Sequence, residues 1–181
     1  MIIGITGPKR SGKTTLGNAL ANRYGLMHTS FAEPIRAFVA QLLGMSAHEL
    51  DLFKASPVGW LDGVTPRSMM QTLGTEWGRA MVHPELWLRS LLRRIENHNG
   101  AVISDVRFPN EAAAILERGG IVLRLSRPGF GYTGEHASEA PLPDDLVSAE
   151  IENDGSPADL LDRSVSLIAR PGVEPDILGD D

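Results

Sequence analysis

Residues 7–14 read Gly-Pro-Lys-Arg-Ser-Gly-Lys-Thr, which fits the pattern Gly-x-x-x-x-Gly-Lys-Ser/Thr. They follow a short apolar run at 1–6 and precede residues 13–24, where apolar side chains recur at helical spacing. A strand, a glycine-rich turn and a helix in this order are typical of a phosphate-binding loop. The alternative is a chance glycine-rich turn, and average composition gives that roughly a one percent probability or less in a chain of this length.

Each fixed position of this motif has a chemical reason. Glycine at 7 and 12 lets the backbone turn where side chains would clash, so consecutive N–H groups can surround an anion. The helix that begins near Lys13 directs the positive end of its dipole to the same point. Lys13 supplies a mobile positive charge for the outer phosphates, and the Thr14 hydroxyl suits Mg²⁺. The motif therefore predicts a site for a nucleoside triphosphate with its metal ion.

Composition narrows the classes of partner. The 181 residues suffice for one domain with a sizeable core. The net charge of −6 does not favour nucleic acid. With no cysteine, the chain has no disulfide framework or thiolate metal site, and it suits a reducing cytosol. No apolar run reaches membrane-spanning length, and no signal peptide is expected because the first residues already form the strand. We expect a cytoplasmic protein with small-molecule partners, and without nucleic-acid or membrane partners.

The remaining apolar patterns alternate between helix and strand. Helices are predicted over 33–44, 65–82, 84–98, 109–118 and 156–169, and strands over 101–105, 121–125 and 146–151. Residues 45–63 are weakly patterned, 128–143 read as a long loop, and 170–181 form an acidic tail that is expected to fray. Strands separated by helices predict a mainly parallel sheet with both faces covered, which binds ligands beyond the carboxyl ends of its strands.

Charged residues follow two of these strands. Asp105 can hold Mg²⁺ or accept a hydrogen bond, and Arg107 can bind a phosphate with two parallel hydrogen bonds. The alternative is an aspartate that caps the turn and pairs with Arg107. Arg127 opens the loop at 128–143, which could close over a nucleotide and exclude water. The alternative interpretation of Arg127 is a surface arginine at a strand end. Beside a phosphate-binding loop we prefer the functional interpretation of all three residues.

The helix predicted over 65–82 has two faces. Its buried stripe is predicted to contain Met70, Leu73, Trp77 and Met81. The opposite face contains Arg67, Gln71, Gly74, Thr75 and Gly78, with Arg79 at the margin. Each mid-helix glycine costs ~1 kcal/mol relative to alanine, so something is expected to approach closely there. A polar ligand such as a nucleotide suits the arginine and glutamine, and packing against a neighbouring helix is the alternative.

Further runs carry a family resemblance. They are residues 31–36, 65–79, 104–112, 136–139 and 151–156, in addition to the loop at 7–14. With these runs the chain resembles, over almost its whole length, the deoxynucleoside monophosphate kinases of bacteriophages, a branch of the P-loop nucleotide kinases. Asp-Val-Arg-Phe-Pro-Asn-Glu at 105–111 and Gln-x-x-Gly-Thr-Glu at 71–76 are its most specific parts.

The resemblance implies a fold and an activity. The fold is the α/β P-loop NTPase three-layer sandwich, a mainly parallel sheet flanked by helices. It implies a single domain over 1–181, with acceptor-binding helices at about 32–98 and a lid at about 128–143. The activity is ATP-dependent phosphorylation of a deoxynucleoside monophosphate to the diphosphate, with Mg²⁺, in the cytoplasm of the host cell if a phage encodes the chain. Base preference, ribose tolerance and the formation of a homodimer stay open.

The resemblance also implies site residues. ATP would be bound by Gly7, Lys9, Arg10, Ser11, Gly12, Lys13, Thr14, Thr15, Asn153 and Gly155, the last two near the donor base, where the resemblance places residues 153–156. The acceptor would be bound by Arg36, Arg67, Gln71, Arg79, Asp105 and Arg107. The catalytic residues would be Lys13, Arg107 and Arg127, and the metal ligands Thr14 and Asp105. Residues 135–139 receive no firm role, and we interpret His136 as a hydrogen-bonding loop residue rather than a base.

Two alternative functions would use the same phosphate loop. One is a kinase for another small phosphate acceptor such as dephospho-coenzyme A. The other is a nucleotide-dependent ATPase or switch, which would release phosphate without needing an acceptor. The concentration of arginines in the matching runs, without a basic or apolar docking segment, favours the monophosphate kinase.

Overall fold

The computed structural model describes residues 1–132 and 140–169. The chain divides into two compact units, one made of Met1–Ser30 with Arg94–Asp181 and the other of Phe31–Arg93. We call them the sheet unit and the helical unit. The helical unit occupies most of the range, 32–98, where acceptor-binding helices are expected.

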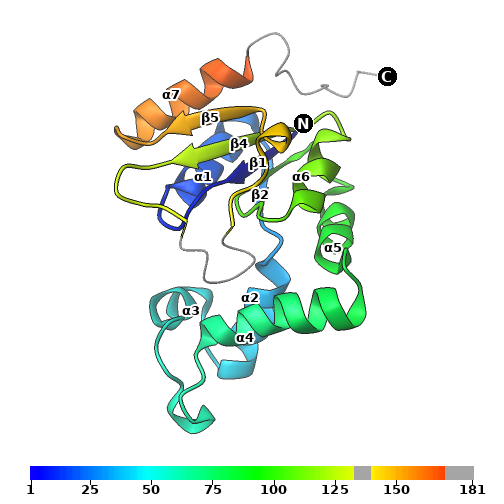
Figure 1. Cartoon of the computed structure of the whole chain (residues 1–181), viewed down its shortest axis with the longest axis vertical. Helices are drawn as coiled ribbons and strands as arrows, with labels where there is room; N and C mark the ends of the chain where they lie inside the picture. Colours follow the sequence, from blue (N-terminus) through cyan, green and yellow to red (C-terminus); the bar gives the residue numbers. More distant parts are fainter. Residues whose placement is uncertain (133–139, 170–181) are drawn as a thin grey trace. The chain divides into compact units, whose positions relative to one another are not determined.

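The sheet unit contains five parallel strands. They are β1 (Ile2–Thr6), β2 (Met27–Thr29), β3 (Ala101–Ile103), β4 (Ile121–Ser126) and β5 (Ala149–Glu152). Their order is β2-β3-β1-β4-β5, so β1 is the central strand (Figure 1). Gly4 of β1 is in register with Ile103 on one side and Val122 on the other. The predicted parallel sheet is confirmed, and its central strand is the one that leads into the motif at 7–14.

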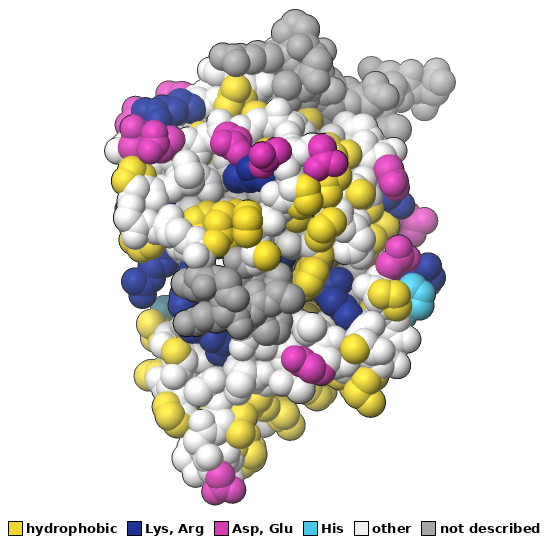
Figure 2. Space-filling view, in the orientation of Figure 1, with side chains coloured by type: hydrophobic (Ala, Val, Ile, Leu, Met, Phe, Trp, Pro, Cys, Tyr) yellow, Lys and Arg dark blue, Asp and Glu magenta, His cyan; other side chains and the backbone are white. Residues whose placement is uncertain are grey.

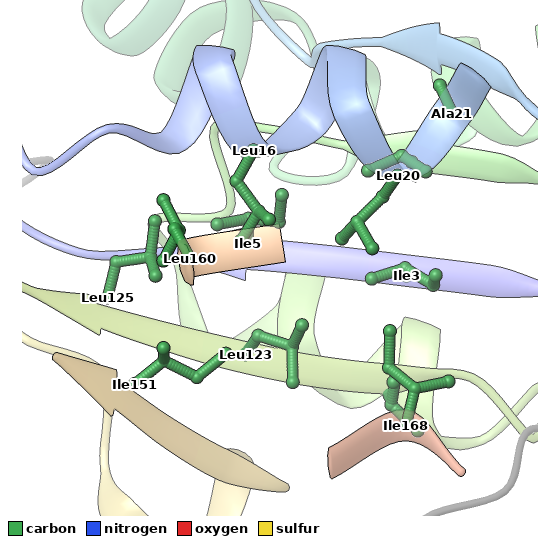
Figure 3. Packing of buried hydrophobic residues seen from close by; sticks show 12 residues of the cluster. Ile3, Ile5, Leu16, Leu20, Ala21, Leu123, Leu125, Ile151, Leu160 and Ile168 are labelled. Atoms are coloured by element: carbon green, nitrogen blue, oxygen red, sulfur yellow. The ribbon is translucent and has the colours of Figure 1, made fainter. Parts of the chain in front are cut away.

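Helices cover both faces of this sheet. On one face lie α1 (Lys13–Tyr24) and α7 (Pro157–Ile168), which contact each other. Their buried side chains pack on those of the strands, as Figure 3 shows for Leu16 and Leu20 of α1 above Ile3 and Ile5 of β1. On the other face, α6 (Pro109–Leu116) contacts β1 and β4. The sheet unit therefore has the expected three layers.

The helical unit is built from short helices. They are α2 (Glu33–Leu43), α3 (Ala47–Phe53), the 3₁₀ turn η1 (Gly59–Leu61), α4 (Pro66–Thr72) and the π-helix η2 (Leu73–Val82), followed by α5 (Leu86–Ile95), in which the boundary between the units falls. A small core of Val39, Ala40 and Leu50 joins α2 to α3. Ser46 and Glu49 form a reciprocal cap that starts α3 within the weakly patterned segment 45–63.

The predicted helix over 65–82 is present, but its second half is π-helical. The prediction of which side chains this half buries is wrong. Trp77 and Met81 are 44% and 78% exposed, whereas Gly74 and Gly78 are buried. A Cβ atom on Gly78 would lie 2.5 Å from Nε1 of Trp87, and this nitrogen donates to the Gly74 carbonyl at 2.7 Å. The close approach predicted at the glycines is made by the α5 indole at Gly78 and by Ile35 of α2 at Gly74, so neighbouring helices account for both glycines. Hydrogen bonds from i to i+5 widen the helix and rotate the stripe away from its α-helical register.

Other differences are local. Strand β2 was not predicted, and the last strand is shorter than the predicted 146–151, since Asp144–Leu146 forms a 3₁₀ turn. Of the predicted loop 128–143, the lid residues Glu135, His136, Ser138 and Glu139 lie outside the described residues, as does the acidic tail. Within the part of the chain that is described, no helix has the length and apolar character needed to cross a membrane.

Candidate functional site

The motif at 7–14 forms a tight turn between β1 and α1. Gly7 and Gly12 have φ angles of 141° and 102°, which side chains rarely tolerate. A Cβ atom on Gly7 would lie 2.4 Å from the Leu125 carbonyl oxygen of β4. Ser11 is fully buried, and its N–H donates to the Pro8 carbonyl at 3.3 Å. The first N–H groups of α1 have no intrahelical acceptor, and no side chain caps them, so this helix end suits an anion.

Lys13 lies over this loop. Its Nζ donates to the carbonyl oxygens of Gly7 at 2.8 Å and Pro8 at 2.5 Å, and to Oγ of Ser11 at 3.4 Å. Burial, with a smaller contribution from the Arg107 charge, lowers the pKa of Lys13 to about 8, and the Asp105 charge partly opposes this shift. Lys13, Asp105 and Arg107 are therefore electrostatically coupled, as the sequence predicts for one phosphate site.

The turn after β3 holds Asp105 and Arg107 through its backbone. Glu111 of α6 is only 1% exposed, and its Oε2 accepts from the N–H groups of Arg107 at 2.9 Å and Phe108 at 3.1 Å. The Val106 N–H donates to the carbonyl of Ile5 in β1 at 3.1 Å. The turn is thus fastened to α6 and to the strand that precedes the phosphate loop. We did not single out Glu111 from the sequence, although an acid at the third position of a helix opened by proline is the signal that could have found it.

Arg127 follows β4 and reaches the same loop. Its NH1 group donates to the Arg10 carbonyl at 3.3 Å, and its guanidinium lies 5.2 Å from the centre of the Phe130 ring. A tight turn places that ring, since the Phe130 N–H donates to the Arg127 carbonyl at 3.1 Å and Gly129 has a φ of 80°. The structure therefore places Arg127 beside the phosphate loop, at the start of the segment expected to form the lid.

The two residues expected near the donor base differ in their surroundings. Asn153 follows β5, and its Nδ2 donates to the Ser11 carbonyl at 2.8 Å. Gly155 lies at the start of α7, where a Cβ atom would be 2.9 Å from Oδ2 of Asp159. Asp159 forms a reciprocal cap with Ser156, as the sequence predicts. Asn153 thus contacts the phosphate loop directly, whereas Gly155 makes room for the cap of α7.

The expected acceptor residues of the helical unit are held within that unit. Arg36 pairs with Asp51 at 2.7 Å, and Lys54 contacts the same carboxylate at 3.3 Å. The Arg67 N–H donates to the Lys54 carbonyl at 2.8 Å, and NH1 of Arg79 donates to the Pro84 carbonyl at 3.3 Å. Gln71 on α4 is half-buried. The side-chain contacts of Arg36 and Arg79 orient these two guanidinium groups, and the Arg67 contact holds only its backbone.

One charged cluster of the sheet unit was not expected. Arg124 of β4 is mostly buried and pairs with Asp144 at 2.6 Å and Glu150 at 2.5 Å, and it donates to the Leu142 carbonyl. The cluster ties the last residues of the expected lid segment, and the turn that precedes β5, to the sheet. Among the described residues on the face drawn in Figure 2, acidic and basic side chains are interspersed over the sheet unit.

The expected metal ligands suit Mg²⁺ held partly by a nucleotide. Thr14 is exposed on the first turn of α1, and Asp105 is half-buried at the neighbouring strand end. Within residues 1–132 and 140–169, no group of three or more His, Asp or Glu side chains could hold a metal ion. Mg²⁺ usually takes one or two protein oxygens and completes its shell with water and substrate phosphates, so this small donor set fits that ion.

Sequence comparison decides the family. The sequence model of the deoxynucleotide monophosphate kinase family matches residues 60–163. A protein of Acanthamoeba polyphaga mimivirus that bears the name deoxynucleotide monophosphate kinase is 35% identical over 159 residues, covering 78% of this chain and 82% of the relative. The chain belongs to the deoxynucleotide monophosphate kinase family. The deoxynucleoside-5′-monophosphate kinase of Escherichia phage T5 is 33% identical to this kinase over 99 residues, which cover 50% of this chain and 40% of the phage protein.

Solved structures agree with the fold of this kinase. Shikimate kinase from Aquifex aeolicus matches with a TM-score of 0.50 at 13% identity, over 93% of this chain and 96% of that one. A sugar kinase from Janibacter sp. matches with a TM-score of 0.52 at 16% identity, over 99% and 98% of the two chains. At these identities the likeness concerns the fold alone, and it confirms the predicted P-loop α/β sandwich. The family resemblance inferred from the motifs is confirmed as well.

Proposed function

We propose that this kinase transfers the γ-phosphoryl group of ATP to the phosphate of a deoxynucleoside monophosphate, giving ADP and a deoxynucleoside diphosphate. The observation that carries the proposal is Lys13 lying over a glycine-rich loop that leads into the start of α1, in a chain of this family. The names of the mimivirus and phage T5 relatives support the same class of acceptor.

Phosphoryl transfer needs positioning and charge more than a strong base. In our proposal the triphosphate lies on the N–H groups of the loop and of the first turn of α1, and Lys13 moves from its loop carbonyls to the outer phosphates. Arg107 and Arg127 face the charge that spreads over the transferred group. Mg²⁺, when bound, would be held by Thr14 and Asp105 and would neutralise charge on the phosphate oxygens. Lys9, Arg10, Ser11 and Thr15 complete the triphosphate site.

The residues assigned to the acceptor, as the family resemblance implies, are Arg36, Arg67, Gln71, Arg79, Asp105 and Arg107. Guanidinium groups bind phosphate with paired, charge-assisted hydrogen bonds, and an amide such as that of Gln71 can read a base edge or a sugar hydroxyl. The base and the sugar that this set prefers are what an acceptor screen would determine.

The decisive experiment is a screen of acceptors with Mg·ATP. The panel contains the four common deoxynucleoside monophosphates, their ribose counterparts, dephospho-coenzyme A and a reaction without acceptor. We expect diphosphate product from at least one deoxynucleotide. Phosphorylation of dephospho-coenzyme A alone would support the other kinase, and acceptor-independent release of phosphate would support an ATPase or switch.

A further inference from the structure

Asn153 connects the end of β5 to the phosphate loop, 142 residues away in the sequence. Its Nδ2 donates to the Ser11 carbonyl at 2.8 Å. Its own N–H donates to the Ser126 carbonyl of β4 at 2.8 Å, which holds the backbone of Asn153 in line with the sheet. A Cβ atom on Gly12 would lie 2.5 Å from the same Nδ2, so the amide fills the space beside that glycine.

This contact determines how one peptide group of the loop is oriented. The peptide between Ser11 and Gly12 is planar and trans, so its C=O and N–H bonds point in opposite directions. With the carbonyl directed at Asn153, the N–H of Gly12 points away from it. Gly12 has a φ of 102°, and glycine adopts many backbone conformations at little cost. Without a clamp, this peptide could turn over and present its carbonyl oxygen to an anion.

We propose that Asn153 is a positioning residue, which fixes the Ser11–Gly12 peptide so that the Gly12 N–H serves the phosphates of a bound nucleotide. The proposal rests on the proposed function only for the nature of the ligand, a magnesium-bound triphosphate. It differs from the role that the family resemblance implies for Asn153, which is proximity to the donor base.

A ligand without a base separates the two roles. We would measure the Kd of Mg·ATP, Mg·GTP and inorganic Mg·tripolyphosphate by calorimetry or by competition with a fluorescent ATP analogue. Asn153→Ala should raise all three Kd values by a similar factor of about ten, which is the usual effect of one lost hydrogen bond. Asn153→Asp should raise them further, because its carboxylate would face the Ser11 carbonyl without a hydrogen to donate.

Arg163→Gln is the matched control. Arg163 of α7 contacts Asp154 at 2.6 Å and the Glu152 carbonyl at 3.0 Å, on either side of Asn153, but it has no part in the phosphate loop. Its Kd values should stay within twofold of the parent. If Asn153→Ala does not fold, as judged by circular dichroism and Tm, the isosteric Asn153→Asp variant gives the answer.

Two outcomes would overturn the proposal. One is an unchanged Kd in both Asn153 variants. The other is a loss for ATP that is absent for GTP or tripolyphosphate, which would assign Asn153 to the adenine base. Failure of the proposed kinase reaction is a separate result, because it would appear as a parent protein that binds these ligands but makes no diphosphate in the acceptor screen.

Discussion

Lys13 donates to carbonyl oxygens of its own loop, so its charge is already placed where a triphosphate would lie. Lys13→Ala should therefore lower kcat/KM for ATP more than a hundredfold. This corresponds to a loss of at least ~3 kcal/mol of transition-state stabilisation, as expected for a lost preorganised charge contact. Steady-state kinetics would measure this. Lys54→Ala is the control, because Lys54 is a partly exposed lysine paired with Asp51. A Lys13→Ala value within tenfold of the parent would refute the assigned role.

The lowered pKa of Lys13, about 8, predicts a pH dependence of binding. Because this pKa is below the ordinary lysine value of 10.5, the unfolded chain binds more protons than the folded protein between pH 8 and 10.5. The free energy of unfolding therefore increases as pH rises through that window. A bound polyanion favours the charged lysine, so the Kd of Mg·ATP should rise above pH 8, by at most about tenfold per pH unit. In Lys13→Arg the rise of the Kd above pH 8 should disappear, since arginine stays charged. The same rise in Lys13→Arg would show that another group titrates.

At the level of the element, the π-helix η2 packs closely against Trp87 of α5. The Trp87 indole fills the space beside Gly78, where a Cβ atom would lie 2.5 Å from Nε1. Gly78→Ala should lower the free energy of unfolding by about 1–3 kcal/mol through overpacking, although alanine is the better helix former. Denaturant titration would measure this. Gly59→Ala is the control, because nothing lies within 4 Å of its added Cβ, and equal stability of the two variants would contradict the packing argument.

The elements that could be predicted are those whose signals are local. The predicted bounds of α1 are confirmed, since its apolar spacing ends at Gly25 in the left-handed conformation. The reciprocal cap of Ser46 and Glu49 is visible in the sequence and was overlooked, so α3 was within reach of prediction. The three residues of β2 are too few to show a period, and the π-helix η2 contacts Trp87 from the next helix, a tertiary contact with no local signal. Neither could be read from neighbouring residues.

In the whole molecule, parallel topology gathers the candidate site of the sheet unit. The phosphate loop, Asp105, Arg127 and Asn153 follow β1, β3, β4 and β5, all at carboxyl ends, as the strand-helix alternation predicts. Their roles in ATP binding and catalysis stay predictions. Of the supports of the site, Glu111 carries a local signal at the start of α6, whereas the Arg124 cluster was not predictable because it depends on which groups the fold brings to this side chain.

The division into two units predicts a division of binding. Arg79 lies in the helical unit and is assigned to the acceptor, whereas the triphosphate is assigned to the loop of the sheet unit. Arg79→Ala should raise KM for the deoxynucleoside monophosphate at least tenfold, as expected for a lost charge-assisted hydrogen bond, and should leave the Kd of Mg·ATP within twofold. Initial rates and ATP titrations would measure the two quantities.

Arg89→Ala is the control for this last prediction, since Arg89 is an exposed arginine of the same unit that pairs with Glu85 at 2.9 Å. It should change neither quantity, because an exposed pair four residues apart contributes little. Arg79 also donates to the Pro84 carbonyl, so a purely structural role is the competing explanation. If the role is structural, Arg79→Ala should lower Tm and weaken the binding of both acceptor and ATP. If Arg79 contacts the acceptor phosphate, the variant should weaken acceptor binding alone and keep the Tm of the parent.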